Sequence, residues 1–316
     1  MRQPSIGRVL VRGAIAAVLL TGCIPGRTGR PTTAAGARPE SFEALAARIQ
    51  RRITAVPGAV VGVAYRDLQT GDTLSINADT SFHAASTMKV PVMIELFRAF
   101  DAGRLRPEQR IVLGNQFKSI VDGSPYSLDA GSDSDSLVYT KVGSEITILE
   151  LIDRMITRSS NLATNTVIEL VGAANANATA HALGARNMRV LRGVEDNKAF
   201  QAGLNNTTTP RDLAVLMEAL ERNTAASPAS SKAMRDIHLR QEFNGEIPAG
   251  LPQGTPVAHK TGFITAVLHD AAIVYPPRGK PYVLVLLTRG IPQRETAREL
   301  MVDVSRLVYA HAMGRR

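Results

Sequence analysis

The chain has 316 residues, of which 44% are hydrophobic and 21% are charged, and this composition is ordinary for a globular protein with a sizeable core. A single cysteine excludes an internal disulfide. The six histidines form no H-x-H or H-E-x-x-H motif, which argues against a catalytic zinc site. The net charge is +9, but no basic run lies in the body of the chain and there is no tryptophan, which disfavours nucleic-acid binding.

The first residues have the pattern of an export signal. Residues 1–22 contain a basic segment and then a short apolar run that ends at Leu20. The only cysteine, Cys23, follows closely, and the segment resembles a bacterial lipoprotein signal. That resemblance implies cleavage before Cys23, lipidation of its thiol, and a lipid anchor in a membrane facing the periplasm or the cell exterior. The alternative is a plain secretory signal with an incidental cysteine. A transmembrane anchor is disfavoured, because the apolar run is too short to span a bilayer.

A flexible tether is expected next, because residues 23–40 are rich in proline, glycine, threonine and alanine. The folded part is expected to begin at Ser41, a suitable N-cap for a helix that stops before Pro57. Residues 59–65 and 73–76 have strand patterns separated by a turn. The first folded elements are therefore predicted to be a helix and two strands.

A helix with many apolar residues is predicted from Ser86 to about residue 103. A serine at a helix start lies beside unpaired N–H groups and the positive end of the helix dipole. Lys89 lies one turn later on the same face, within reach of the Ser86 oxygen. A lysine can take the serine proton if burial lowers its pKa, so the two residues can form a nucleophile pair. Alone the S-x-x-K pattern is weak, because about one arises by chance in a chain of this length. Without further support, an N-cap serine followed by a solvated lysine is the better explanation.

The middle of the chain is predicted to be helical. Residues 122–136 are rich in aspartate, glycine and serine, which fits either a mobile surface loop or the rim of a cleft. Thr147 and Glu150 form a capping box before a helix with one apolar face. That helix ends at the S-S-N sequence of residues 159–161, and more helix follows.

The last third of the chain changes character. Residues 192–206 are predicted to be a long loop, and Thr209 to be the N-cap of the helix after it. A closing amphipathic helix is expected at the carboxyl terminus. Strands are predicted at residues 257–261, 269–275 and 282–288. This order of strands, helices, strands and a helix predicts an α+β domain whose sheet joins both chain ends.

Three short motifs stand in order along the chain: Ser86-Thr87-Met88-Lys89, Ser159-Ser160-Asn161 and Lys260-Thr261-Gly262. With this set, the chain resembles the class A serine β-lactamases and their penicillin-binding relatives over residues 41–316. The resemblance implies a β-lactamase/transpeptidase-like fold, in which an antiparallel sheet from both chain ends packs with helices beside an all-α lobe. It also implies a monomeric serine hydrolase that needs no metal or cofactor and acts on a β-lactam or a D-alanyl peptide.

The resemblance assigns a role to each motif residue. Ser86 would attack the amide carbonyl, with its own N–H and one near residue 263 stabilising the oxyanion. Lys89 would relay the serine proton, and Ser159 would pass a proton to the leaving nitrogen. The substrate-binding residues would be Asn161 for the amide side chain, Lys260 and Thr261 for the carboxylate, and Gly262, which lets the strand approach the substrate.

The long loop decides which activity the resemblance implies. The family has a glutamate there with an asparagine four residues later, to activate the water that releases the acyl group, and this chain lacks that spacing. Glu195, with Asn197, is the nearest equivalent, although a solvated loop acid is almost as good an interpretation. If Glu195 reaches the water, the protein is a β-lactamase. Otherwise it is a penicillin-binding protein such as a D-alanyl-D-alanine carboxypeptidase, or another serine hydrolase on this fold. A non-catalytic lipoprotein that binds the cell wall is the alternative from a different class.

Two further positions depart from the family pattern. Ser160 stands where the family has aspartate, at a position whose role is structural. No arginine is found at the strand position that commonly assists Thr261, and His269 and Asp270 lie there instead.

Overall fold

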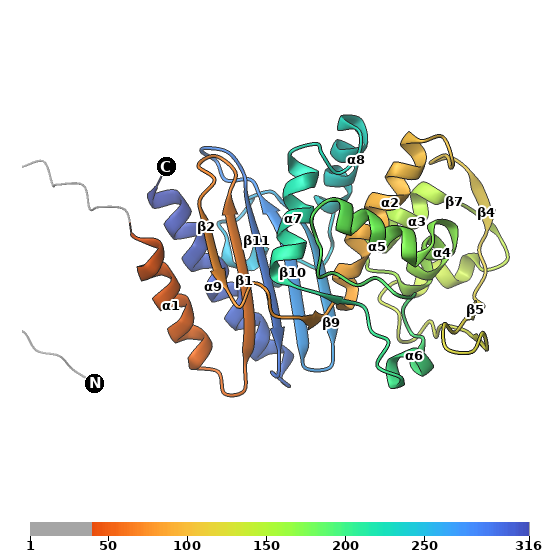
Figure 1. Ribbon diagram of the computed structural model, residues 1–316, viewed down its shortest axis with the longest axis horizontal. Coiled ribbons are helices and arrows are strands. Elements are labelled where there is room, and N and C mark those ends of the chain that lie inside the picture. The colour runs from red at the N-terminus through yellow and green to blue at the C-terminus, as the bar shows by residue number, and fades with distance from the viewer. Residues whose placement is uncertain (1–39, 316) are drawn as a thin grey trace, which may run out of the picture. The chain divides into compact units, whose positions relative to one another are not determined.

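The computed structural model describes residues 40–315 (Figure 1). The expected signal peptide, the lipidation site Cys23 and the tether up to residue 39 lie outside this range. Within residues 40–315, no helix combines the length and the apolar character needed to cross a membrane.

A five-stranded antiparallel sheet is the centre of the fold, and its strand order is β2-β1-β11-β10-β9 (Figure 1). The first two strands come from the amino-terminal part of the chain and the other three from the carboxyl-terminal part, so the prediction of a sheet formed by both chain ends is confirmed. The strands are β1 (Val60–Asp67), β2 (Thr73–Ile76), β9 (Val257–Ile264), β10 (Val267–Val274) and β11 (Tyr282–Arg289).

One face of the sheet is covered by the first and the last helix, α1 (Phe42–Thr54) and α9 (Arg294–Gly314) (Figure 1). Side chains alternate between the two faces of a strand, so Leu284 and Leu286 of β11 pack against these helices. Both leucines are fully buried, and they join the apolar faces of α1 and α9 into one core.

On the other face of the sheet, α7 (Pro210–Glu221) packs against β1, β10 and β11, and the remaining helices lie beside the sheet around α2 (Lys89–Asp101) (Figure 1). Val283 and Val285 of β11 point into this second, larger core. The central strand is therefore buried on both sides, which explains its continuous apolar sequence. The helices are α2 (Lys89–Asp101), α3 (Ile148–Thr157), α4 (Asn161–Val171), α5 (Ala173–Ala182), α6 (Asn197–Gln201), α7 (Pro210–Glu221) and α8 (Pro228–His238). Three short 3₁₀ helices are η1 (Ala85–Met88), η2 (Ser136–Lys141) and η3 (Pro248–Gly250). Six short strands pair outside the main sheet: β3 (Phe82–His83) with β8 (Thr207–Thr208), β4 (Arg110–Val112) with β7 (Glu145–Thr147), and β5 (Phe117–Lys118) with β6 (Pro125–Tyr126).

Helix starts were predictable because they are encoded locally. The side chains of Ser41, Thr147 and Thr209 each accept the backbone N–H three residues on, as N-caps do.

The prediction of a long loop over residues 192–206 is wrong in part, because the short helix α6 lies inside it. Asp196 caps this helix by accepting the N–H of Ala199, and five residues are too few to produce a periodic pattern.

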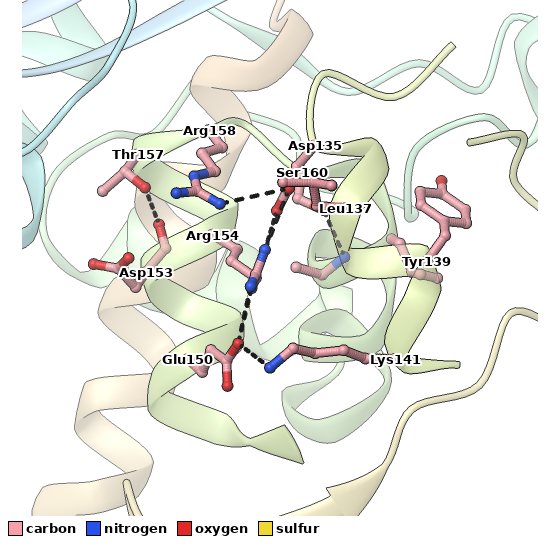
Figure 2. Close-up of polar contacts among 12 residues, drawn as sticks. Asp135, Leu137, Tyr139, Lys141, Glu150, Asp153, Arg154, Thr157, Arg158 and Ser160 are labelled. Carbon is pink, nitrogen blue, oxygen red and sulfur yellow. Dashed lines mark hydrogen bonds and ion pairs between the residues drawn. The ribbon is translucent and has the colours of Figure 1, made fainter. Parts of the chain in front are cut away.

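A chain of ion pairs ties α3 to Asp135 and to Lys141 of η2, next to the junction between α3 and α4 (Figure 2). Arg154 of α3 donates to the buried carboxylate of Asp135 at 2.9 Å and to Glu150 at 3.0 Å, and Lys141 donates to the same Glu150 oxygen at 2.8 Å. The carbonyl of Arg154 also accepts the N–H of Ser160 at 3.1 Å. The end of α3 is thereby tied to the segment that carries the second motif.

Candidate active site

Ser86 lies in the short 3₁₀ helix η1, directly before α2, and is half-buried. It lines a cavity of about 300 Å³ together with Asn161, Glu195 and Phe263. Strand β9 passes close behind it. A Cβ at Gly262 would lie only 3.2 Å from the Ser86 nitrogen and 3.2 Å from the Ala85 Cβ. The strand can approach the nucleophile this closely because residue 262 has no side chain.

The three motifs meet at the hydroxyl of Ser159. Lys89 Nζ lies 3.2 Å from Ser159 Oγ, and Lys260 Nζ lies 3.0 Å from the same atom. Both lysines are fully buried, and Ser159 is 8% exposed. A hydroxyl can accept a hydrogen bond from an ammonium and donate one to a neutral amine, so Ser159 can carry a proton between the two lysines.

The electrostatics of the two buried lysines favour a neutral amine. Burial lowers the pKa of Lys89 to about 7, against the opposing influence of the carboxylates of Asp133 and Glu195. Burial also holds the pKa of Lys260 well below its usual range, and the nearby Lys89 lowers it further. The Lys89 amine is therefore far more easily deprotonated than an ordinary lysine, and a neutral amine can accept a proton from a serine.

Asn161 connects this lysine pair to the long loop. Its Oδ1 accepts a hydrogen bond from Lys89 Nζ at 3.0 Å, and its Nδ2 donates to Glu195 Oε1 at 3.2 Å. The carboxylate of Glu195 therefore faces the same cavity as Ser86. Asn197, the other loop residue expected at the site, also lines this cavity.

The backbone before Glu195 is held by α4. Asn165 Oδ1 accepts the N–H of Val194 at 2.6 Å, and Asn165 Nδ2 donates to the Val194 carbonyl at 3.0 Å. A Cβ at Gly193 would lie 2.5 Å from Asn165 Oδ1, so only glycine permits this approach. Glu195 itself has a left-handed backbone with φ +61°. The loop is thus fixed where the carboxylate enters the cavity, although Glu195 is an exposed residue.

Several residues beside the cavity have a strained backbone conformation. Between residues 40 and 315, six non-glycine residues have a left-handed φ, and three of them are Ala85 (+45°), Ser159 (+58°) and Glu195 (+61°). Such conformations persist only where surrounding contacts impose them, and they cluster at functional sites. The contacts made by these residues therefore determine the geometry of the cavity.

Asp133 is a site residue that the sequence pattern did not reveal. Its buried carboxylate accepts the N–H groups of Asn161 and Leu162, both at 2.9 Å, at the start of α4. The loop of residues 122–136 therefore contributes a carboxylate next to the second motif. Ser160 is the N-cap of α4 and accepts the N–H of Ala163 at 3.2 Å. These two side chains together satisfy the first N–H groups of the helix.

Known proteins match the chain over almost its whole described length. A sequence profile of the beta-lactamase enzyme family matches residues 44–312. The chain belongs to this family. Beta-lactamase AST-1 of Nocardia asteroides is 29% identical over 95% of this chain and 94% of its own. The solved structure of PBP-A is 33% identical with a TM-score of 0.74, and covers 88% of this chain and 99% of its own. The beta-lactamase of Sphaerobacter thermophilus DSM 20745 has the same TM-score at 27% identity, and covers 87% of this chain and 99% of its own.

Two positions near the site differ from the family pattern, and the structure shows what the residues there contact. Ser160 replaces the aspartate of the second motif, and Asp133 supplies a carboxylate at the helix start from another loop. His269 and Asp270, which lie where the resemblance led us to expect an arginine, are fully buried. Asp270 pairs with His259 at 2.9 Å, and His269 Nε2 donates to the His83 carbonyl at 2.8 Å, so both are engaged elsewhere.

We expect Ser159→Ala to lower kcat/KM for benzylpenicillin by about 10²–10³-fold, because the two buried amines lose the hydroxyl between them. Stopped-flow measurement of the acylation rate should show the loss in that step. Ser132→Ala, in an exposed loop, is the control and should keep the wild-type rate. An acylation rate unchanged by Ser159→Ala would exclude this hydroxyl from proton transfer.

Proposed function

We propose that this protein is a serine β-lactamase of class A type, which hydrolyses the β-lactam amide through an acyl-enzyme on Ser86. The single observation that supports this choice most is the hydrogen bond from Asn161 to Glu195, because it holds a carboxylate in the cavity that contains Ser86. A carboxylate there can act as a general base for a water molecule that attacks the acyl group.

Acylation begins when Ser86 Oγ attacks the β-lactam carbonyl and its proton passes to the neutral Lys89 amine. The N–H groups of Ser86 and Phe263 stabilise the oxyanion that forms. The amide C–N bond then breaks, and the leaving nitrogen receives a proton through Ser159. The lowered pKa of Lys89 supports its role, because an ordinary lysine is almost entirely protonated at neutral pH.

The other motif residues bind the substrate. Lys260 and Thr261 bind the substrate carboxylate, with Gly262 allowing close approach, and Asn161 holds the amide of the acyl side chain.

Deacylation follows when Glu195 removes a proton from a water molecule that attacks the ester carbonyl. Glu195 then returns this proton to Ser86 as the product acid leaves.

Between residues 40 and 315 no cluster of three or more histidine, cysteine, aspartate or glutamate side chains is arranged to hold a metal ion.

A penicillin-binding D-alanyl-D-alanine peptidase is the second candidate, and the 33% identity to PBP-A favours it. A mutant of PBP-A has been solved as an acyl-enzyme complex with penicillin G. A fluorescent penicillin separates the possibilities when its label on the protein is followed on a gel while hydrolysis is followed by absorbance. Transient label with rapid hydrolysis supports the β-lactamase, and stable label without hydrolysis supports the peptidase. No label at all would leave the non-catalytic lipoprotein.

Lipid anchoring is a separate proposal, which rests on Cys23 and the export pattern before it. Expression of the full chain in a bacterium should place the wild-type protein in the membrane fraction, and its mass should include a lipid on Cys23. We expect Cys23→Ala to lose the lipid and to appear as an uncleaved precursor or a soluble exported protein. A wild-type protein cleaved at another residue, with an unmodified thiol, would show a plain secretory signal.

A further inference from the structure

His83 lies three residues before the nucleophile and lines the same cavity as Ser86. It belongs to the two-residue strand β3, which pairs with β8 at the end of the long loop. The next residue, Ala84, donates its N–H to the carbonyl of Asn206 at 2.8 Å. The segment that leads into Ser86 is thus attached on one side to the loop that carries Glu195.

Ala85, between His83 and Ser86, has a left-handed backbone with φ +45° and is 7% exposed. An alanine enters this region only when neighbouring contacts impose it, because its Cβ then crowds the backbone. The N–H of Ala85 donates to Nδ1 of the His83 ring at 3.0 Å. This ring therefore satisfies a buried donor in the strained peptide that immediately precedes the nucleophile.

The ring of His83 has a defined protonation pattern. A backbone N–H can only donate, so Nδ1 of His83 is the unprotonated nitrogen that accepts from Ala85. Burial lowers the pKa of His83, and the Arg192 guanidinium lowers it further, so the ring is neutral at neutral pH. The neutral His83 ring can therefore accept the N–H of Ala85 without changing its charge.

The backbone of His83 is fixed from the other side by His269. Nε2 of His269 donates to the His83 carbonyl at 2.8 Å, and Nδ1 of His269 lies 2.8 Å from the Leu268 carbonyl of β10 and 3.2 Å from the Thr288 nitrogen of β11. Burial lowers the pKa of His269 to about 4, which keeps this ring neutral as well. Strands β10 and β11 therefore hold β3 in place through one buried ring.

We propose that His83 is a positioning residue for the nucleophile: its Nδ1 holds the strained Ala85 peptide and so directs the N–H of Ser86 at the oxyanion. This inference rests on the proposed acyl-transfer function. An N–H group in the oxyanion hole lowers the activation barrier only if it points at the oxygen on which negative charge develops in the transition state. The ring therefore acts through Ser86 and touches no reacting atom.

The test compares two substitutions at this position. His83→Leu removes the acceptor, and we expect the acylation rate constant for benzylpenicillin to fall about 10- to 100-fold with little change in substrate binding. His83→Asn should restore most of this rate, because an asparagine oxygen accepts the N–H two residues on, as in an Asx turn. The matched control is His181→Leu, in α5, whose ring contacts the carbonyl of Met188, and it should acylate at the wild-type rate.

Each outcome decides between the alternatives. Wild-type acylation in His83→Leu, or equal losses in the leucine and asparagine variants, would overturn the positioning role. If neither variant folds, ¹⁵N-edited NMR of the wild-type histidines decides: the proposal requires an unprotonated Nδ1 in His83 at pH 7, and a proton on that nitrogen would overturn it. If the wild-type protein is not acylated at all, the proposed function fails. The NMR measurement still reports whether His83 Nδ1 accepts the N–H of Ala85.

Discussion

Ser86→Ala should abolish both acylation and hydrolysis, lowering the turnover of benzylpenicillin by about 10⁴-fold or more. The reason is that no other hydroxyl is proposed to reach the carbonyl, while the lysines and the oxyanion N–H groups remain in place without a nucleophile. The fold should not change, because the half-buried serine side chain is replaced by a smaller one. Steady-state absorbance assays and intact-protein mass spectrometry measure the two losses independently.

The control for this substitution is Ser81→Ala, five residues earlier at an exposed position, which should keep full activity. Residual turnover of a β-lactam by Ser86→Ala at more than a trace level would remove Ser86 from the mechanism. A variant that still binds penicillin without forming an adduct would instead agree with the proposed role.

Glu195→Gln should separate the two halves of the reaction. Glutamine has the shape of glutamate and its oxygen can still accept from Asn161, but an amide cannot take a proton from water. We therefore expect near-normal acylation and a deacylation rate about 10²–10⁴-fold lower, so that the acyl-enzyme accumulates. Rapid-quench mass spectrometry should find most of the protein carrying one penicillin.

Glu299→Gln, on the exposed side of α9, is the matched control and should turn over like the wild type. Unchanged steady-state hydrolysis in Glu195→Gln would assign the base to another group. Loss of acylation together with hydrolysis would show that the carboxylate acts earlier in the reaction.

The motifs could be placed from the sequence because each one coincides with a locally encoded boundary. The apolar run after Ser86 marks a helix, the capping box at Thr147 fixes the helix that ends before Ser159, and the β-branched residues of the last third mark strands. The order of the predicted elements indicated a sheet formed by both chain ends, and the resemblance implied that the motifs meet; the order of the strands within the sheet was not predicted.

Other features depend on contacts between distant residues. Asp133 lies 28 residues before Asn161, and nothing in its own segment distinguishes a surface carboxylate from one that caps α4. The position of Glu195 depends on Gly193 fitting against Asn165, a contact that only the folded chain defines. The spacing rule of the family could not place this glutamate, because the loop departs from the family spacing.

The most direct measurement is time-resolved mass spectrometry of the wild-type protein mixed with benzylpenicillin, with peptide mapping of any adduct. The mechanism predicts a transient gain of one penicillin mass on the peptide that contains Ser86, and the return of the unmodified mass once the substrate is consumed. Hydrolysis without any adduct on that peptide, or an adduct that persists after the free penicillin is gone, would contradict it.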